Sequence, residues 1–460
     1  LATGEWFGAY CLTEPGAGSD ANSGKTKAVL SEDGTHYKIT GQKMWISNAG
    51  FAHIFIVFAR IEDDKNITGF IVPKDLENGI TLGEEENKLG IKASSTRQVF
   101  FNETKVPVEN MLAGRGDGFK IGMNALNVGR IKLAAACLEA QRRVTTLATQ
   151  YATERVQFKT PIAQFGAIQQ KLAIMATNTY VSESASYRAA FDIEEKIAQL
   201  LEQGLSHQEA ELKGVEEFAI ECSILKVSVS EKAQDCTDEG IQIYGGMGFS
   251  ADAPMEMAWR DARIARIYEG TNEINRMLCV GMLLKKGFKG EIDLMSAATK
   301  VGQELMEGIP KAELANTFFA EEKNLLQNLK KAMLMITGAA VQTFGPKFDK
   351  EQQIILALSD ILIEIYMIES AILRTEKNCE RYGIDSQKNQ IEMTQLYLFD
   401  AIEKINSKGK EALVSFAEGA QLKGMIAGLK QYTKYQNYPN VVALRRNVAA
   451  TLIEENKYPF

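Results

Sequence analysis

The stretch TRQVFFNETKVPVENMLAGRGDGFKIGMNALNVGR, residues 96–130, contains the point where the chain changes from predicted strands to predicted helices. Its first part, residues 96–107, is rich in Val, Phe and Thr, as β-strands are. After Gly118 the apolar residues recur at helical spacing with few breakers. The sequence therefore predicts a β domain followed by a helical part.

On the N-terminal side of this point, residues 1–112 have the pattern of a β domain. Further runs rich in Ile, Val, Phe and Tyr occupy residues 36–47, 53–61 and 67–73 and are separated by Gly, Asn and Asp. Short strands at such spacing are typical of an antiparallel barrel or sandwich.

On the C-terminal side the pattern is helical. Residues 113–290 are expected to form a four-helix bundle, with helices at 119–151, 165–202, 206–243 and 254–286. Residues 300–460 are expected to form an additional helical domain, with helices at 324–343, 351–382, 388–417 and 441–455. The predicted fold class is α+β, mainly helical.

Composition excludes several kinds of protein. The chain has 460 residues, is 45% hydrophobic and carries a net charge of −7, which argues against nucleic-acid binding. No apolar run reaches the ~20 residues of a membrane span. The six cysteines contain no CxxC pair, so reduced thiols are expected. Three separated histidines argue against a zinc site.

The segment YCLTEPGAGSDANSGKTKA, residues 10–28, is the densest motif. Its glycines leave backbone amides exposed for an oxygen-rich ligand. One alternative is a plain glycine-rich turn. Another is a P-loop, but Gly18 lies one residue too far from Gly24, and no strand-loop-helix context surrounds it.

Three further motifs each leave two interpretations open. Trp45 in QKMWIS (42–47) is either a core residue or an aromatic wall for a flat ring. Arg155 in ATERVQFKTPIAQFGAIQ (152–169) is either solvated or a phosphate ligand. The glycines of QIYGGMGF (242–249) either end a helix or admit a ligand close to the backbone.

The segment RIARIYEGTNEINR, residues 263–276, interrupts a helical pattern. Gly270 permits a break, and Thr271 and Asn272 can cap a new helix. Glu269 then lies on the break. It is either a solvated residue at a helix end or a carboxylate that takes part in chemistry.

Together and in this order, these motifs resemble the acyl-CoA dehydrogenase family of flavoproteins, over about residues 5–285. The remainder, with residues 119–130, is similar to the very-long-chain branch, whose members carry an extra C-terminal helical domain. The family also has an N-terminal helical domain. Because this chain begins with Leu1 and reaches the first motif at Tyr10, we expect that domain to be missing.

The resemblance implies roles for individual residues. Glu269 would be the catalytic base, with Gly270 beside it, and Ser19, Asn127, Arg130 and Tyr268 would contact the substrate. Contacts with FAD are implied for Tyr10, Cys11, Leu12, Thr13, Gly18, Ser19, Trp45, Ile46, Ser47, Arg155, Phe158, Gln169, Gln242, Gly245, Gly246, Thr271, Asn272 and Glu273. Asn127 departs from the Asp of some members, and Lys159 stands where Gly is common.

The implied reaction is α,β-dehydrogenation of a medium- to long-chain fatty acyl-CoA to the trans-2-enoyl-CoA in β-oxidation. Electron-transfer flavoprotein would be the acceptor, and the enzyme would be a homodimer or tetramer. A carboxylate can remove the α-proton only if the site stabilises the developing enolate oxygen, which the N–H of the base residue does in the family. Burial beside Ile267 and Tyr268 is expected to raise the pKa of Glu269.

Other interpretations remain open. The chain could be an acyl-CoA oxidase, another flavoenzyme of the superfamily, or a non-catalytic scaffold. Residues 300–460 are expected to contain no catalytic residue and to bury the apolar helix at 352–373. The alternative for this part is peripheral contact with a membrane surface. The expected location is the cytoplasm of a bacterium, or the mitochondrial matrix or inner-membrane surface of a eukaryote.

Overall fold

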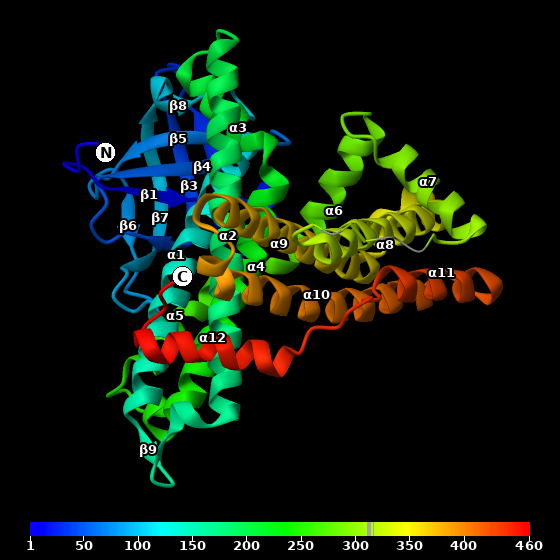
Figure 1. Ribbon diagram of the computed structural model, residues 1–460. Helices are drawn as coiled ribbons and strands as arrows, with labels where there is room; N and C mark the ends of the chain where they lie inside the picture. The colour runs from blue at the N-terminus through cyan, green and yellow to red at the C-terminus, as the bar shows by residue number, and fades with distance from the viewer. Residues whose placement is uncertain (311–313, 316) are drawn as a thin grey trace. The chain divides into compact units, whose positions relative to one another are not determined.

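The computed structural model describes residues 1–310, 314–315 and 317–460 (Figure 1). The chain separates into two compact units, Leu1–Val128 and Gly129–Phe460, and each is described by itself. The division of the chain into three domains stays a prediction.

The first unit is built on one eight-stranded sheet in the order β6-β7-β3-β2-β4-β5-β8, with β1 beside β4. The strands are β1 (Gly8–Cys11), β2 (Lys27–Leu30), β3 (His36–Ser47), β4 (Ile54–Ile61), β5 (Thr68–Pro73), β6 (Ile80–Leu82), β7 (Thr96–Pro107) and β8 (Met111–Leu112). The predicted strands are confirmed as β3, β4, β5 and β7.

The direction of pairing differs in part from the prediction. Most neighbours are antiparallel, but β1 and β2 both run parallel to β4. Parallel neighbours need a long connection, and β3 with its flanking turns supplies it between β2 and β4. Because alternation of apolar residues does not encode strand direction, the sequence could not show that the sheet is mixed.

The two halves of the sheet share one core. Phe55 of β4 lies edge-on to Phe101 of β7, with ring centroids 6.4 Å apart. Tyr37 of β3 meets Phe70 of β5 at 5.3 Å. Side chains from facing strands interdigitate in this way in a sandwich.

The helical part begins with α1 (Gly118–Glu154), which runs across the boundary of the two units. It continues with α2 (Gly166–Glu202), α3 (His207–Glu217), α4 (Ala219–Tyr244), α5 (Pro254–Ala262) and α6 (Asn272–Phe288). The helix predicted at 206–243 is therefore two helices separated at Phe218. A capping box between Ser206 and Glu209 starts the first of them.

The C-terminal helices are α7 (Leu294–Glu307), α8 (Ala320–Phe344), α9 (Gln352–Tyr382), α10 (Lys388–Val414), α11 (Gly419–Tyr432) and α12 (Val441–Glu455). The predicted helices are confirmed as α8, α9, α10 and α12. The structure adds the two short helices α7 and α11.

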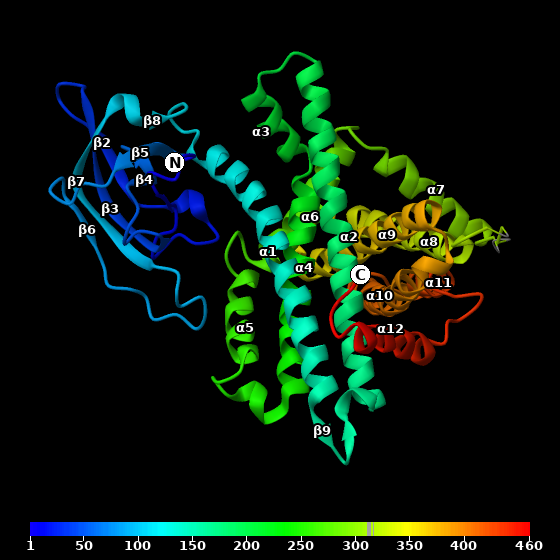
Figure 2. The same ribbon diagram turned by 60° about the vertical axis from the view of Figure 1, so that its left-hand side comes forward.

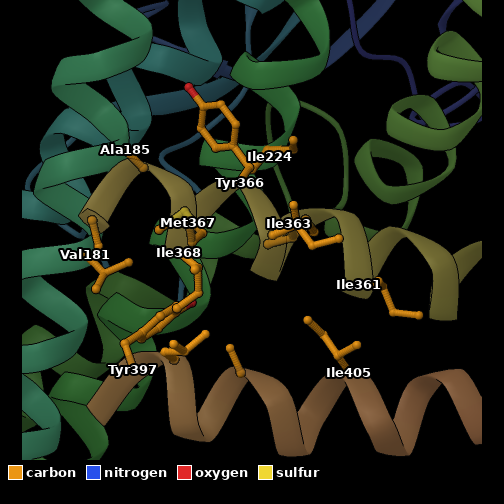
Figure 3. Packing of buried hydrophobic residues seen from close by; sticks show 14 of the residues in the cluster. Val181, Ala185, Ile224, Ile361, Ile363, Tyr366, Met367, Ile368, Tyr397 and Ile405 are labelled. Atoms are coloured by element: carbon orange, nitrogen blue, oxygen red, sulfur yellow. The ribbon is translucent and has the colours of Figure 1, made fainter. Parts of the chain in front are cut away.

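Helix α9 joins the bundle and the C-terminal helices into one core. Figures 1 and 2 both show α8 and α10 beside α9. In Figure 3, Val181 and Ala185 of α2 and Ile405 of α10 lie around the apolar side chains of α9. The hydroxyls of Tyr180 and Thr375 are 2.8 Å apart. The predicted burial of α9 is confirmed, and most of its apolar side chains are inside the protein.

None of the helices in the described ranges combines the length and the apolar character that crossing a bilayer requires.

Candidate active site

The loop that carries Glu269 lies between two helices, as predicted. α5 ends at Ala262, a 3-10 turn covers Arg263–Arg266, and α6 starts at Asn272. Thr271 caps α6 by accepting a hydrogen bond from the Ile274 N–H at 3.3 Å. Glu269 has φ 58°, a left-handed conformation that is uncommon outside glycine and frequent at functional sites.

The main-chain oxygens of this loop are held from inside the bundle. Arg130 Nε donates to the oxygen of Glu269 at 3.2 Å. Lys226 Nζ donates to the oxygen of Gly270 at 2.7 Å. Asn275 Nδ2 donates to both oxygens, at 3.4 and 2.9 Å. Within the part of the chain that the structure describes, no hydrogen bond involves the Glu269 N–H. The loop is therefore fixed through its carbonyl groups.

The carboxyl group of Glu269 packs against Gly129 of α1. A Cβ atom at residue 129 would lie 2.5 Å from Glu269 Oε2, so any other residue there would displace the carboxylate from this position. Burial raises the pKa of Glu269, although Arg130 and Lys226 act in the opposite direction.

The raised pKa confirms the direction expected from the sequence, and burial is its first cause. Ile267 and Tyr268, the two residues before Glu269, are themselves 48% and 41% exposed. The backbone of Gly129 also lies close to the carboxyl group.

The predicted substrate contacts have different environments. Arg130 is only 4% exposed, and its guanidinium is occupied by the loop and by Ser223 at 3.5 Å. Asn127 is buried on α1, whereas Ser19 and Tyr268 are exposed.

In the first unit, the segment after β1 forms a tight turn. Main-chain hydrogen bonds of 3.1 Å join Glu14 and Ala17 in both directions. Open space surrounds Gly16 and Gly18, so their amides are accessible. A single 3-10 turn, Ala21–Ser23, is followed by β2 rather than a helix. The P-loop alternative is therefore excluded.

A buried ion pair holds this segment to β3. Lys43 Nζ lies 2.6 Å from Glu14 Oε1 and donates to the oxygen of Leu12 at 3.0 Å. Glu14 also accepts hydrogen bonds from the N–H groups of Lys25 and Thr26. Burial alone would raise the pKa of Glu14, but Lys43 and these donors outweigh it and lower the pKa. The pair connects the first motif to the strand that carries Trp45.

Trp45 lies on a bulge of β3. The pairing of β3 with β7 shifts between Lys43 and Ile46, and Trp45 has φ 59°. Its side chain is 53% exposed, whereas Ile46 is buried and Ser47 exposed. The bulge turns the indole out of the core, so the core interpretation of Trp45 is excluded. Tyr10, packed against Phe58, is a second half-exposed aromatic residue of this unit.

Arg155 begins a small hairpin at the end of α1. The strands β9 (Val156–Gln157) and β10 (Thr160–Pro161) are joined by Phe158 and Lys159, with φ 53° and 62°. Two successive left-handed residues define a type I′ turn, which explains why glycine suits position 159. Arg155 is exposed, and Phe158 is 90% exposed at the tip.

Glycines follow Tyr244 at the end of α4. Gly245 has φ 61°, and its N–H donates to the oxygens of Gln242 and Ile241. This geometry confirms the predicted helix end, while open space around Gly245 and Gly246 leaves room for a ligand. Tyr244 stacks on Tyr151 of α1 at 4.0 Å, which brings the two helix ends together.

The remaining predicted residues are placed as follows. Gln169 lies in the first turn of α2 and is half-buried, and Gln242 is exposed near the end of α4. Asn272 is buried and bonded to Lys226, whereas Glu273 is exposed in the first turn of α6. Cys11 is buried with the other cysteines, all as free thiols, and Leu12 and Thr13 are half-buried.

Sequence reasoning missed four residues that shape the site: Gly129, Lys226, Asn275 and Lys43. A signal existed for Lys226, because a lone lysine interrupts the apolar pattern of SILKVSV in a predicted helix. Gly129 and Asn275 have no such signal.

Comparisons with known proteins match three parts of the chain to family models. Residues 9–104 match the family described as acyl-CoA dehydrogenase, middle domain. Residues 116–283 and 328–431 match two families, both described as acyl-CoA dehydrogenase, C-terminal domain.

Relatives cover most of the chain. A probable acyl-CoA dehydrogenase of Bacillus subtilis (strain 168) is 42% identical over 100% of this chain and 76% of its own length. The mitochondrial very long-chain specific acyl-CoA dehydrogenase of Homo sapiens is 34% identical over 90% of this chain and 64% of its own length.

A solved structure of an acyl-CoA dehydrogenase from Bacillus anthracis, complexed with FAD, superposes with a TM-score of 0.93 at 41% identity. It covers 98% of this chain, which in turn covers 76% of that protein. The structure of butyryl-CoA dehydrogenase from Megasphaera elsdenii superposes with a TM-score of 0.54 at 38% identity. The match covers 61% of this chain and 68% of that protein. The chain belongs to the acyl-CoA dehydrogenase family, and the predicted fold class is confirmed.

Proposed function

We propose that this protein is an FAD-dependent acyl-CoA dehydrogenase in which Glu269 is the catalytic base. It would convert a medium- to long-chain fatty acyl-CoA to the trans-2-enoyl-CoA in β-oxidation. The observation that carries the proposal is the loop at Glu269, which is fixed through its carbonyl oxygens and holds a half-buried carboxylate with a raised pKa.

The residues of the chain fit FAD. In the first unit, exposed aromatic rings of Trp45 and Tyr10 offer faces for a flat ring, and the open amides of Gly16 and Gly18 offer donors. In the second unit, Arg155 and the open turn at Gly245 and Gly246 suit a pyrophosphate. The other predicted contacts with FAD, some of them buried residues, stay proposals that rest on the resemblance to the family. FAD supplies the hydride acceptor, which no side chain can provide.

The chain's own residues would handle the proton. The Glu269 carboxylate removes the α-proton of the thioester, and its raised pKa makes it a stronger base. The Glu269 N–H is suited to donate a hydrogen bond to the thioester oxygen, where negative charge develops. The bonds from Arg130 and Lys226 to the neighbouring oxygens keep this N–H and the carboxylate in a fixed relation.

We assign Arg130 a different role from the predicted contact with CoA. Its Nε atom is bonded to the Glu269 oxygen, and the side chain is buried, so it supports the loop rather than offering a free charge to a ligand. Ser19, Asn127 and Tyr268 stay as proposed substrate contacts.

We further propose a homodimer or tetramer that passes electrons to electron-transfer flavoprotein. Exposed apolar side chains of Val156, Phe158, Met247 and Phe249 support assembly, because such groups usually mark protein contacts. The buried free thiols support a reducing compartment, the cytoplasm of a bacterium or the mitochondrial matrix.

The test is anaerobic titration of the purified full-length protein with saturated acyl-CoA thioesters of increasing length. We expect a yellow protein whose flavin absorbance bleaches as enoyl-CoA forms, with slow reoxidation by air and fast reoxidation by electron-transfer flavoprotein. Rapid reoxidation by air with release of peroxide would instead identify an oxidase. A flavin-loaded protein that no acyl-CoA bleaches would contradict the proposed function.

A further inference from the structure

The C-terminal helices contact the catalytic helix through a charged pair. Asp360 of α9 accepts a hydrogen bond from Arg276 Nε of α6 at 2.9 Å. Both side chains are largely buried, with 12% and 13% of their surfaces exposed. Arg276 lies less than two helical turns after the Thr271 cap, so this contact is made close to the Glu269 loop.

The pair continues toward the loop. The two terminal nitrogens of Arg276 donate to the two oxygens of Glu231 on α4, each at 2.8 Å. Glu231 Oε1 also accepts from Asn272 Nδ2 at 2.9 Å. Arg276 therefore joins α9, α6 and α4 at one point.

The last links reach the backbone beside the base. Asn272 Oδ1 accepts from Lys226 Nζ at 2.7 Å, and the same ammonium donates to the Gly270 oxygen at 2.7 Å. A continuous series of hydrogen bonds thus leads from Asp360 to the peptide that follows Glu269.

The Arg276 guanidinium and the Glu231 carboxylate favour each other's charged form. Burial alone would lower the pKa of Arg276, but Glu231 and Asp360 more than offset this and raise it. Burial alone would raise the pKa of Glu231, but Arg276 outweighs it and lowers the pKa. Removing one partner from a buried charged network leaves the others uncompensated, so they move to new partners or to water.

We propose that Asp360 is a positioning residue: it fixes Arg276 and Glu231, and through them the Asn272–Lys226 contact that holds the Glu269 loop. The catalytic part of this inference rests on the proposed function, whereas the structural part does not. The C-terminal helices would then contribute to catalysis without supplying a group that touches the substrate.

A second ion pair of α9 provides a matched control. Glu369 accepts from Arg188 Nη1 of α2 at 3.1 Å and also pairs with Lys330 of α8. This pair also joins α9 to the bundle, but its described partners lie outside the series that reaches Gly270. A purely structural role for such pairs predicts the same behaviour for Asp360→Asn and Glu369→Gln.

The experiment compares these two variants in the FAD-loaded full-length protein. We expect Asp360→Asn to lower kcat between about twofold and thirtyfold with little change in KM, the range found for coupled residues. In the substrate-free protein, amide hydrogen exchange in peptides covering residues 264–276 should be faster in Asp360→Asn than in the wild type. Asp360→Glu keeps the charge, so it should restore part of the wild-type kcat and part of the wild-type protection of the loop from exchange. Glu369→Gln should leave kcat and loop exchange unchanged even where it lowers Tm.

The two readouts separate the possible failures. Loop exchange needs no turnover, so it tests positioning even in a protein that oxidises no acyl-CoA. Equal loop exchange in the two variants would overturn the inference. Faster loop exchange in Asp360→Asn with wild-type kcat would overturn its catalytic part.

Discussion

The ammonium group of Lys226 lies 2.7 Å from the main-chain oxygen of Gly270, the residue that follows the proposed base. Lys226 is fully buried, and burial together with the nearby Arg130 lowers its pKa to about 8. A buried cation directed at a backbone oxygen fixes the loop and also adds positive charge near the Glu269 carboxylate.

Replacing this lysine should change the pH dependence of turnover. Glu269 must be ionised to act, so kcat/KM is lost as the pH falls through its pKa, which lies above the ordinary value near 4.5. Lys226 lowers that pKa, so Lys226→Met should move the acid limb to higher pH and reduce kcat by about tenfold or more. Lys286→Met, which breaks a pair with Glu217 on α3, is the control. An acid limb at the wild-type pH in Lys226→Met would show that its charge does not reach Glu269.

Gly129→Ala should separate activity from stability. The added Cβ would lie 2.5 Å from Glu269 Oε2 and displace the carboxylate, whose side chain can move. A displacement of about 1 Å can cost around a hundredfold in kcat. The free energy of unfolding should stay level or rise, because alanine favours a helix over glycine by about 1 kcal/mol. Gly281→Ala on α6, where the Cβ meets open space, should leave turnover unchanged. Wild-type turnover in Gly129→Ala would contradict this placement of the carboxylate.

Lys43→Met should destabilise the first unit. The change leaves Glu14 buried without its partner, which typically costs about 3–5 kcal/mol in the free energy of unfolding. Loss of FAD should accompany it, because the same pair holds the segment before Ser19. Lys27→Met removes an exposed pair with Asp63, so it should change the free energy of unfolding by no more than about 0.5 kcal/mol. Denaturant unfolding measures the free energy of unfolding of each variant, and flavin release measures its loss of FAD. Equal effects of the two variants would refute the prediction.

Arg155→Ala should weaken FAD retention and the association of subunits together. Arg155 starts the exposed hairpin whose tip is Phe158, and ligand binding and assembly are linked when one favours the other. Sedimentation with and without added FAD measures the effect. A monomer that retains FAD tightly would contradict the proposed link.

The elements that could be predicted from sequence are those with a strong local pattern. The strands at β3 and β7 and the helix α9 follow from β-branched runs and apolar periodicity. The break around Glu269 follows from the local chemistry of Gly270 and Thr271, because a left-handed residue and a helix cap are encoded by adjacent residues.

The parts that escaped prediction depend on contacts between distant residues. Lys226 reaches Gly270 across 44 positions, and Arg276 reaches Asp360 across 84. Neither sequence neighbourhood signals its partner. The break at Phe218 and the parallel pairing of β1 with β4 are likewise set by packing, which a linear pattern does not record.

The most direct test of the account is rapid mixing of the FAD-loaded Glu269→Gln variant with acyl-CoA under anaerobic conditions. Glutamine preserves the shape of the side chain but cannot accept the α-proton. We predict that the variant binds FAD and acyl-CoA as the wild type does, while flavin bleaching slows by about 10²–10⁴-fold, the usual loss for a general base. Bleaching at the wild-type rate in the FAD-loaded variant would show that Glu269 is not the base.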